Sequence, residues 1–183
     1  MKNLFLMFCL QIATVGLSQQ LEKATIVEKK SIDLKKHEVK FGGVKLLAGP
    51  VLELTYEFIY SKDFSYGSSI LVNFEATSDF NESFSITPFS RFYFQESKEY
   101  GAQGFFVEGF LKLAKGKQQP DLFNSNKVDY TSGGLGLCLG KKWINNSGFV
   151  FEILAGGARG FGDGVSAPKA YFRGDLNIGY RFN

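Results

Sequence analysis

Two residues of types that catalyse reactions occur in isolation in this chain of 183 residues. His37 is the only histidine, and a catalytic histidine needs a nucleophile and an orienting partner beside it. It precedes the first predicted strand, away from the long predicted loops, so we assign it no catalytic role. Cys138 lies on the inward face of a predicted strand, and we interpret it as a small interior filler rather than a nucleophile. No catalytic residue is predicted.

Two further segments have residue types that bind ions. Gly160-Phe-Gly-Asp-Gly164 looks like part of a phosphate-binding loop, but such loops need a helix N-terminus and no helical pattern follows. Asp121, Asn124, Asn126 and Asp129 could bind calcium weakly, but their spacing is not that of an EF-hand and the glycine at its sixth position is missing. We predict exposed loops in both places, with no metal and no cofactor.

The largest set of chemically capable residues consists of charged side chains on the polar positions of alternating segments. The set comprises Glu53, Glu57, Glu75, Glu108, Glu152 and Asp175 with Arg91, Lys112, Lys142, Arg173 and Arg181. These charges nearly cancel, so they could pair across a narrow interior or form a path for protons or ions. Because eight strands enclose an interior that side chains just fill, we predict that these charges form a paired structural plug. The predicted plug comprises all of them except Lys142.

The elements that position these charges follow from a period of two that begins at His37. Eight runs of about ten residues are predicted as strands. They are Glu38–Ala48, Val51–Tyr60, Tyr66–Thr77, Ser83–Phe94, Gly104–Ala114, Thr131–Trp143, Phe149–Arg159 and Ala170–Phe182. Turn-forming residues such as Gly49-Pro50 separate them. The first run slips at Gly42-Gly43, where we predict a β-bulge.

Each run has one apolar and one polar face, as where Leu54 and Tyr56 alternate with Glu53, Thr55 and Glu57. Two architectures share this pattern. A soluble lipocalin-like barrel puts its apolar face inside, and an outer-membrane barrel puts it outside. Alternation alone does not choose between them.

Three observations favour the outer-membrane barrel. The polar face mixes nearly balanced charges with glycine, which leaves room for long charged side chains to cross a narrow lumen. Strands of about eleven residues tilted by about 40° cover roughly 28 Å, enough for an apolar band of about 25 Å. The fifth and seventh connections, Lys115–Tyr130 and Gly160–Lys169, are long while the second and sixth are short, although the first is shorter and the fourth longer than this rule predicts. The predicted fold is an all-β, eight-stranded antiparallel up-and-down transmembrane barrel.

The first residues have the pattern of an export signal. Lys2 precedes an apolar run from Leu4 to Val15, and Gly16 and Ser18 precede a predicted cut. The run is too short to span a bilayer as a helix. We therefore predict a signal peptide at 1–18, a charged periplasmic lead-in at 19–36 and an outer-membrane barrel at 37–183.

The last strand, Ala170–Phe182, resembles the closing strand of outer-membrane barrels, although Asn183 follows its terminal aromatic residue. The likeness extends over Ser85–Phe94, Gly104–Gly109, Gly134–Trp143 and Ser147–Leu154. From His37 to Phe182 the chain resembles a poorly characterised family of small bacterial outer-membrane β-barrel proteins, with the eight-stranded architecture of OmpA and OmpX. The resemblance implies contact with outer-membrane lipid and with the barrel-assembly machinery, and it supplies no catalytic residue.

Charge and composition restrict the function. The net charge is +3 and no basic stripe stands out, which argues against a nucleic-acid binder. We expect a non-enzymatic protein of the Gram-negative outer membrane with a structural or surface-interaction role, its long loops open to an extracellular ligand. Two alternatives stay open: a soluble periplasmic lipocalin-like lipid carrier, and an outer-membrane enzyme that modifies lipid or peptide.

Overall fold

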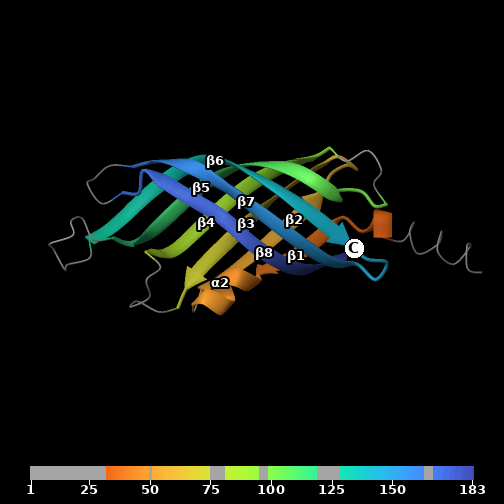
Figure 1. The fold of residues 1–183 in the computed structure, drawn as a ribbon, viewed down its shortest axis with the longest axis horizontal. Helices are drawn as coiled ribbons and strands as arrows, with labels where there is room; N and C mark the ends of the chain where they lie inside the picture. Colours follow the sequence, from red (N-terminus) through yellow and green to blue (C-terminus); the bar gives the residue numbers. More distant parts are fainter. Residues whose placement is uncertain (1–31, 50, 75–80, 95–98, 119–127, 163–166) are drawn as a thin grey trace, which may run out of the picture.

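The sheet closes on itself because its last strand pairs with its first (Figure 1). The computed structural model describes residues 32–49, 51–74, 81–94, 99–118, 128–162 and 167–183. The strands are β1 (His37–Gly42), β2 (Val51–Ile59), β3 (Phe64–Asn73), β4 (Glu82–Tyr93), β5 (Gly104–Gln118), β6 (Val128–Ile144), β7 (Phe149–Phe161) and β8 (Ala170–Phe182). Every strand pairs antiparallel with its neighbours in sequence, so the predicted eight-stranded antiparallel barrel is confirmed.

The strand ends differ from the prediction mainly in β5 and β6. Both strands continue into the segment predicted as a long loop, and their pairing extends to Gln118 and Val128. Lys117 pairs with Asp129 in this extension, since the period of two runs on beyond the apolar stretch. The predicted loop between Lys115 and Tyr130 is therefore wrong at both ends, and β5 and β6 are the longest hairpin of the barrel.

The predicted bulge at Gly42-Gly43 is also wrong, because the chain leaves the sheet there and forms helix α2 (Gly43–Ala48). Lysine, leucine and alanine in this segment favour a helix. Asp175 of β8 stabilises its start, since its Oδ1 accepts a hydrogen bond from the Val44 backbone N–H at 3.0 Å. A side chain at position 42 would overlap the Asp175 carboxylate, so Gly42 leaves room for this carboxylate to reach α2.

The strands are strongly staggered around the barrel. The stagger can be followed from each residue to its paired residue on the next strand around the barrel. Starting on β8, this circuit runs through Phe182, His37, Phe58, Tyr66, Ser90, Gly109, Leu137, Gly157 and Phe172. The circuit returns to β8 ten residues before its start, from Phe182 to Phe172. Such a stagger makes the strands tilt from the barrel axis, typically by 35–45°. One end of the barrel holds both described ends of the chain, and α2 lies toward the other (Figure 1).

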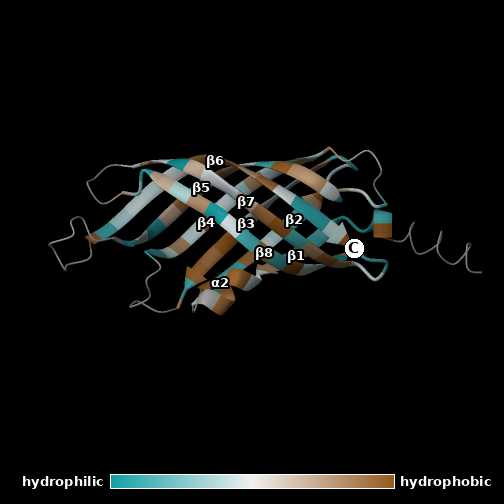
Figure 2. Ribbon diagram, in the orientation of Figure 1, coloured by the Kyte–Doolittle hydropathy of each residue, from teal (hydrophilic) through white to brown (hydrophobic). Residues whose placement is uncertain are grey.

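Burial alternates along the strands between residues that face the lumen, meaning the interior of the barrel, and residues on the outer face. Hydrophilic and hydrophobic residues are interspersed along the strands in the same way (Figure 2). Glu53, Thr55 and Glu57 of β2 are buried, whereas Leu54 and Tyr56 between them are exposed. The same alternation places the leucines of β6 outside, with 65% of Leu137 exposed. The apolar face of the sheet is therefore its outer face.

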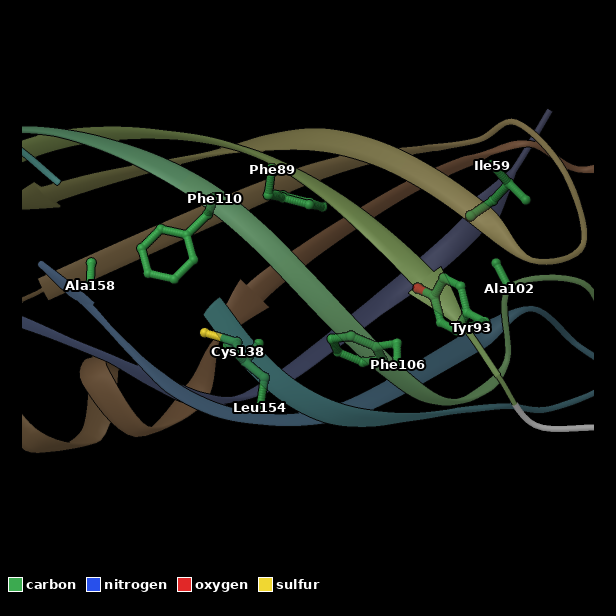
Figure 3. Packing of buried hydrophobic residues seen from close by; sticks show 9 residues of the cluster. All are labelled: Ile59, Phe89, Tyr93, Ala102, Phe106, Phe110, Cys138, Leu154 and Ala158. Atoms are coloured by element: carbon green, nitrogen blue, oxygen red, sulfur yellow. The ribbon is translucent and has the colours of Figure 1, made fainter. Parts of the chain in front are cut away.

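The lumen also contains a cluster of apolar side chains, most of them on β4 to β7, with Ile59 from β2 and Ala102 from the connection between β4 and β5. The cluster comprises Ile59, Phe89, Tyr93, Ala102, Phe106, Phe110, Cys138, Leu154 and Ala158 (Figure 3). Two glycines of β6 make room for rings among them. A Cβ at Gly136 would lie 2.6 Å from the Phe110 ring, and one at Gly140 would overlap the Phe106 ring. These two glycines thus make room for phenylalanine, whereas Gly179 of β8 makes room for a charged side chain, Lys40, as predicted.

Residues before and between the strands close the end of the barrel that holds both described chain ends. Ile32 is buried against Tyr100, Ile144 and Val150, and the Asp33 carboxylate accepts a hydrogen bond from the Gly101 backbone N–H at 3.0 Å. The described part of the predicted solvated lead-in therefore packs on the barrel. No helix in the described part of the chain is long and apolar enough to span a membrane.

Candidate functional site

The centre of the lumen is a carboxylate surrounded by hydrogen-bond donors. Glu57 forms ion pairs with Arg91 Nη1 at 2.6 Å, with Lys142 Nζ at 2.7 Å and with Lys40 Nζ. It also accepts hydrogen bonds from Ser65 Oγ at 2.5 Å and from the Tyr93 hydroxyl at 2.7 Å. All of these side chains are buried. Glu57 is therefore held as an ionised acceptor from several sides.

Arg91 joins three acidic residues from different strands. Its Nη1 lies 2.7 Å from Glu152 Oε2, and its Nε donates to Glu108 Oε2 at 2.7 Å, in addition to the contact with Glu57. The ring centroids of Phe89 and Phe106 lie 4.4 and 4.5 Å from the guanidinium carbon of Arg91. The guanidinium thus has both carboxylate and cation–π partners, which offset the loss of its hydration.

Glu38 carries the network to the end of the lumen that holds the chain ends. Its carboxylate lies 2.8 Å from Lys142 Nζ and 2.6 Å from Arg181 Nη2. Arg181 also donates to the backbone carbonyl of Gly101 at 2.9 Å, in the connection that closes this end of the barrel. The ion pairs and the closing connection are thus linked.

Glu108 carries the network toward the other end. Its second oxygen accepts a hydrogen bond from Arg173 Nε at 2.8 Å, and Arg173 Nη1 lies 2.8 Å from Glu53. Glu53 also pairs with Lys45 of α2, whose Nζ lies 3.6 Å from Asp175. Contacts therefore continue from the centre of the lumen to the helix in the wall.

A separate pair of charges lies further toward the mouth. Lys112 Nζ is 2.8 Å from Glu82 Oε1 and 5.4 Å from the ring of Tyr171. The Tyr171 hydroxyl shares a hydrogen bond with Ser132. This group fills the mouth opposite the chain ends.

The charges that these ion pairs join are balanced. The acids are Glu38, Glu53, Glu57, Glu82, Glu108, Glu152 and Asp175. The bases are Lys40, Lys45, Arg91, Lys112, Lys142, Arg173 and Arg181. Seven of each leave no excess charge that would attract one kind of ion, and multiple partners hold most of them in place. The arrangement can brace the wall of the barrel across its lumen.

The chain was compared with protein-family models, with curated proteins and with solved structures. None of them matches it. The interpretation of the site therefore depends on its own geometry.

The structure brings the predicted network together in the lumen with one exception. Glu53, Glu57, Arg91, Glu108, Lys112, Glu152, Arg173, Asp175 and Arg181 all point inward and are buried. Glu75 lies outside the described residues. Lys142, named on the polar face but left out of the predicted network, belongs to it through Glu38 and Glu57.

The sequence reasoning missed three charged members of the network near the start of the chain. Glu38 and Lys40 lie on β1, whose short alternation was hidden by the helical segment that follows it. Lys45 was assigned to a strand, and its helical position lets it reach two strands at once. Glu38 and Lys40 are two residues apart and therefore lie on the same face of a strand, as Glu53 and Glu57 do at a spacing of four. This spacing was the signal that could have placed both residues in the network.

The remaining candidate residues lie apart from one another. His37 is on the outer face, where its Nδ1 is 2.7 Å from the Tyr56 hydroxyl and its ring contacts Phe182. Cys138 is buried in the lumen, with Sγ 3.8 Å from the Arg173 carbonyl oxygen. Of the proposed calcium ligands only Asp129 is described, and it is exposed near Lys117.

Part of the glycine-rich segment is also described. Gly160 and Phe161 end β7, and the described chain continues to Gly162, whereas Asp163 and Gly164 lie outside the described residues. Within the described part of the chain, no group of three potential ligands among histidine, cysteine, aspartate and glutamate could hold a metal ion.

Proposed function

We propose that this chain is an integral outer-membrane β-barrel protein with a structural or surface-interaction role and no catalytic activity. One observation carries the proposal. The barrel buries its network of ion pairs in the lumen and exposes most of its large apolar side chains on the outer face, the reverse of a soluble protein. Soluble monomers rarely expose contiguous apolar patches above a few hundred Å². Apolar side chains encircle this barrel, as they must where the solvent is lipid.

Aromatic rings at the end that holds the chain ends support this placement. Outward aromatic residues there include Tyr60, Phe64, Tyr66, Phe94, Phe105, Trp143, Phe149, Phe151, Tyr180 and Phe182. Such girdles mark the membrane–water interface of outer-membrane barrels. Lys141 is outward as well, but its Nζ lies 4.6 Å from the Phe105 ring and 5.1 Å from the Trp143 ring. Its charge is thereby directed toward this interface, as snorkelling lysines are.

The height of the outer face supports it too. At a tilt of about 40°, each residue advances roughly 2.5 Å along the barrel axis. The stretch of β8 from Phe172 to Phe182, whose large outward side chains are apolar, then rises about 25 Å, the height of the apolar band of such barrels. We infer that the end with both chain ends faces the periplasm and that the connections at the other end face outside. The predicted signal peptide at 1–18 and the closing strand β8 would supply export and recognition by the assembly machinery.

The two alternatives have less support. A lipid carrier needs an apolar cavity, whereas the lumen here is crossed by ion pairs from Glu38 to Arg173. An enzyme acting on lipid or peptide needs a nucleophile next to a base. Among the described residues, the histidine is on the outer face and the cysteine contacts a backbone carbonyl, far along the chain from each other.

The test of the proposal is the gel mobility of the membrane-extracted protein with and without boiling. We expect the protein in the outer-membrane fraction, released only by detergent, with a heat-dependent shift because a closed barrel stays folded in cold detergent. Release by osmotic shock, with no shift, would overturn the proposal.

A pair of matched variants sharpens this test. Leu137→Arg puts a cation on the outer face within the proposed apolar band, where it costs about 2–4 kcal/mol in lipid, and Phe161→Arg puts it near the rim, where it costs about 0–1 kcal/mol. Leu137→Arg should reduce the heat-shifting form much more than Phe161→Arg. Equal effects would contradict a lipid environment, because water accommodates both.

A further inference from the structure

A depression of about 790 Å³ lies at the end of the hairpin formed by β7 and β8. It is lined by Gly157, Ala158, Arg159, Gly160, Lys169, Ala170 and Tyr171. Within this set Gly157, Arg159 and Ala170 are exposed and alternate with more buried neighbours. They therefore belong to the outer face of the barrel, and this end of the β7–β8 hairpin lies at the left in Figure 1.

Two cations border this depression. Arg159 pairs with Ala170, the residue after Lys169, and the Gly160 N–H donates to the Lys169 carbonyl at 2.8 Å. In the described part of the chain neither Arg159 nor Lys169 has an anionic partner, in contrast to the paired cations of the lumen. Two neighbouring like charges repel each other, so an anion bound between them would be stabilised.

The outer face beside the two cations has small side chains, so the surface is recessed there. Ala155 and Gly157 lie outward on β7, whereas the ring of Phe172 covers Gly174 on β8, so the small residues form a short stripe along β7. Phe172 borders this stripe and is 78% exposed. A hydrocarbon chain can lie along such a stripe in contact with the Phe172 ring. The surface thus offers an apolar track that ends at two positive charges.

The position of Arg159 and Lys169 along the barrel axis is suitable for binding a lipid phosphate. Gly157 and Phe172 are the last two residues in the circuit of paired residues that starts at Phe182. They lie about 25 Å from Phe182 along the barrel axis. Arg159 and Lys169 lie two and three residues beyond them along their strands. They therefore border the far edge of the proposed apolar band, at the level of lipid head groups, where clustered basic residues bind lipid phosphate.

We propose that this depression binds a phosphorylated lipid of the outer leaflet, with its phosphate between Arg159 and Lys169 and an acyl chain along the short stripe of Ala155 and Gly157, beside the Phe172 ring. Guanidinium binds phosphate through two parallel hydrogen bonds and ammonium binds it as a point charge. The inference rests on the proposed function, because only a barrel embedded in lipid presents this surface to the outer leaflet.

The test measures binding of a soluble short-chain phosphorylated glycolipid to detergent-purified protein by native mass spectrometry. Arg159→Gln with Lys169→Gln should weaken binding at least about tenfold, the effect of one lost charge-assisted hydrogen bond of about 1.5–3 kcal/mol. The matched control is Lys115→Gln with Lys117→Gln, which removes two charges from β5 on the same rim and should leave binding nearly unchanged. Ala170→Leu fills the depression without removing a charge and should weaken lipid binding as well.

Two further ligands identify the source of the phosphate. The same lipid without phosphate should bind much more weakly, and inorganic phosphate alone should not compete. Equal losses in the β5 control, equal binding of the dephosphorylated lipid, or full competition by inorganic phosphate would each overturn the inference.

The failure of this inference is distinguishable from that of the proposed function. Each variant is also tested for membrane extraction and for the heat-dependent gel shift. An intact, membrane-embedded barrel that binds the lipid equally well with and without Arg159 and Lys169 overturns only the lipid site. A wild-type chain that is soluble and shows no shift overturns both.

Discussion

At the scale of single residues, the lumen depends on carboxylates that are far from water. Glu57 has three cationic partners and two hydroxyl donors, all buried with it. Replacing a whole buried ion pair by apolar groups is often neutral, whereas removing one partner leaves an uncompensated charge. The network is therefore more sensitive to the loss of one charge than to the loss of a balanced pair.

Glu57→Gln should destabilise the folded barrel by about 3–5 kcal/mol, because Lys40, Arg91 and Lys142 then share too few acids. The measurement is the free energy of unfolding in urea, with the protein in lipid vesicles. In the double variant with Lys142→Gln, which restores charge balance, the loss should be smaller than the sum of the two single losses. A Glu57→Gln barrel as stable as wild type would contradict the role of the network.

At the scale of elements, the wall has a gap that α2 fills. β1 ends at Gly42, opposite Asn177, so β8 from Ala170 to Leu176 has no strand partner on that side. Lys45 of α2 reaches the carboxylates of both edges, Glu53 on β2 and Asp175 on β8. The outward side of the helix is apolar, and Leu47 is 90% exposed. α2 therefore joins two strands that do not pair with each other.

Lys45→Gln should destabilise the barrel by about 3 kcal/mol, the lower end of the range for a broken buried pair, because the Lys45 side chain is 14% exposed. The midpoint temperature of the heat-dependent gel shift reports this change. The matched control is Lys141→Gln on the outer face, which removes ring contacts and no ion pair within the described chain, and which should lower the midpoint less. Equal midpoints for the two variants would show that α2 does not hold the wall.

At the scale of the whole molecule, balanced charge and filled volume argue for a closed lumen. In the described part of the lumen, seven acids form ion pairs with seven bases, and the rings of Phe89, Phe106 and Phe110 lie against Arg91 and Arg173. An eight-stranded barrel has an interior that side chains just fill. The lumen thus serves as a brace rather than a path for ions.

The wild-type protein should show no steady ion current in planar lipid bilayers. The double variant Arg91→Ala with Arg173→Ala removes the two guanidiniums that link the halves of the network, and it should raise the current because water can enter the vacated space. A heat-dependent gel shift of the double variant checks that its barrel is closed. Steady current through the wild type would contradict the brace and favour a pore.

Much of this architecture was predictable from local sequence. Alternation with a period of two places Glu53 and Glu57 on one face and Leu54 and Tyr56 on the other wherever the strand lies. Eight such runs with short connections predict an up-and-down barrel, and all eight strands are found. The alternating pattern gave a wrong prediction after Gly42, where a strand was predicted and a helix is found. β1 has only six residues and continues directly into this helix, with no turn residue other than glycine between them.

The sequence by itself determined which side chains share a face, because the pleat of a strand is a local property of the backbone. Only the closed structure decided which face is inside and which charges meet. Glu57 and Lys142 are 85 positions apart, and Arg181 and Glu38 are 143 apart, so their contact exists only after β8 closes on β1. The stagger of the strands then sets which side chains meet at each height, and no local pattern encodes it.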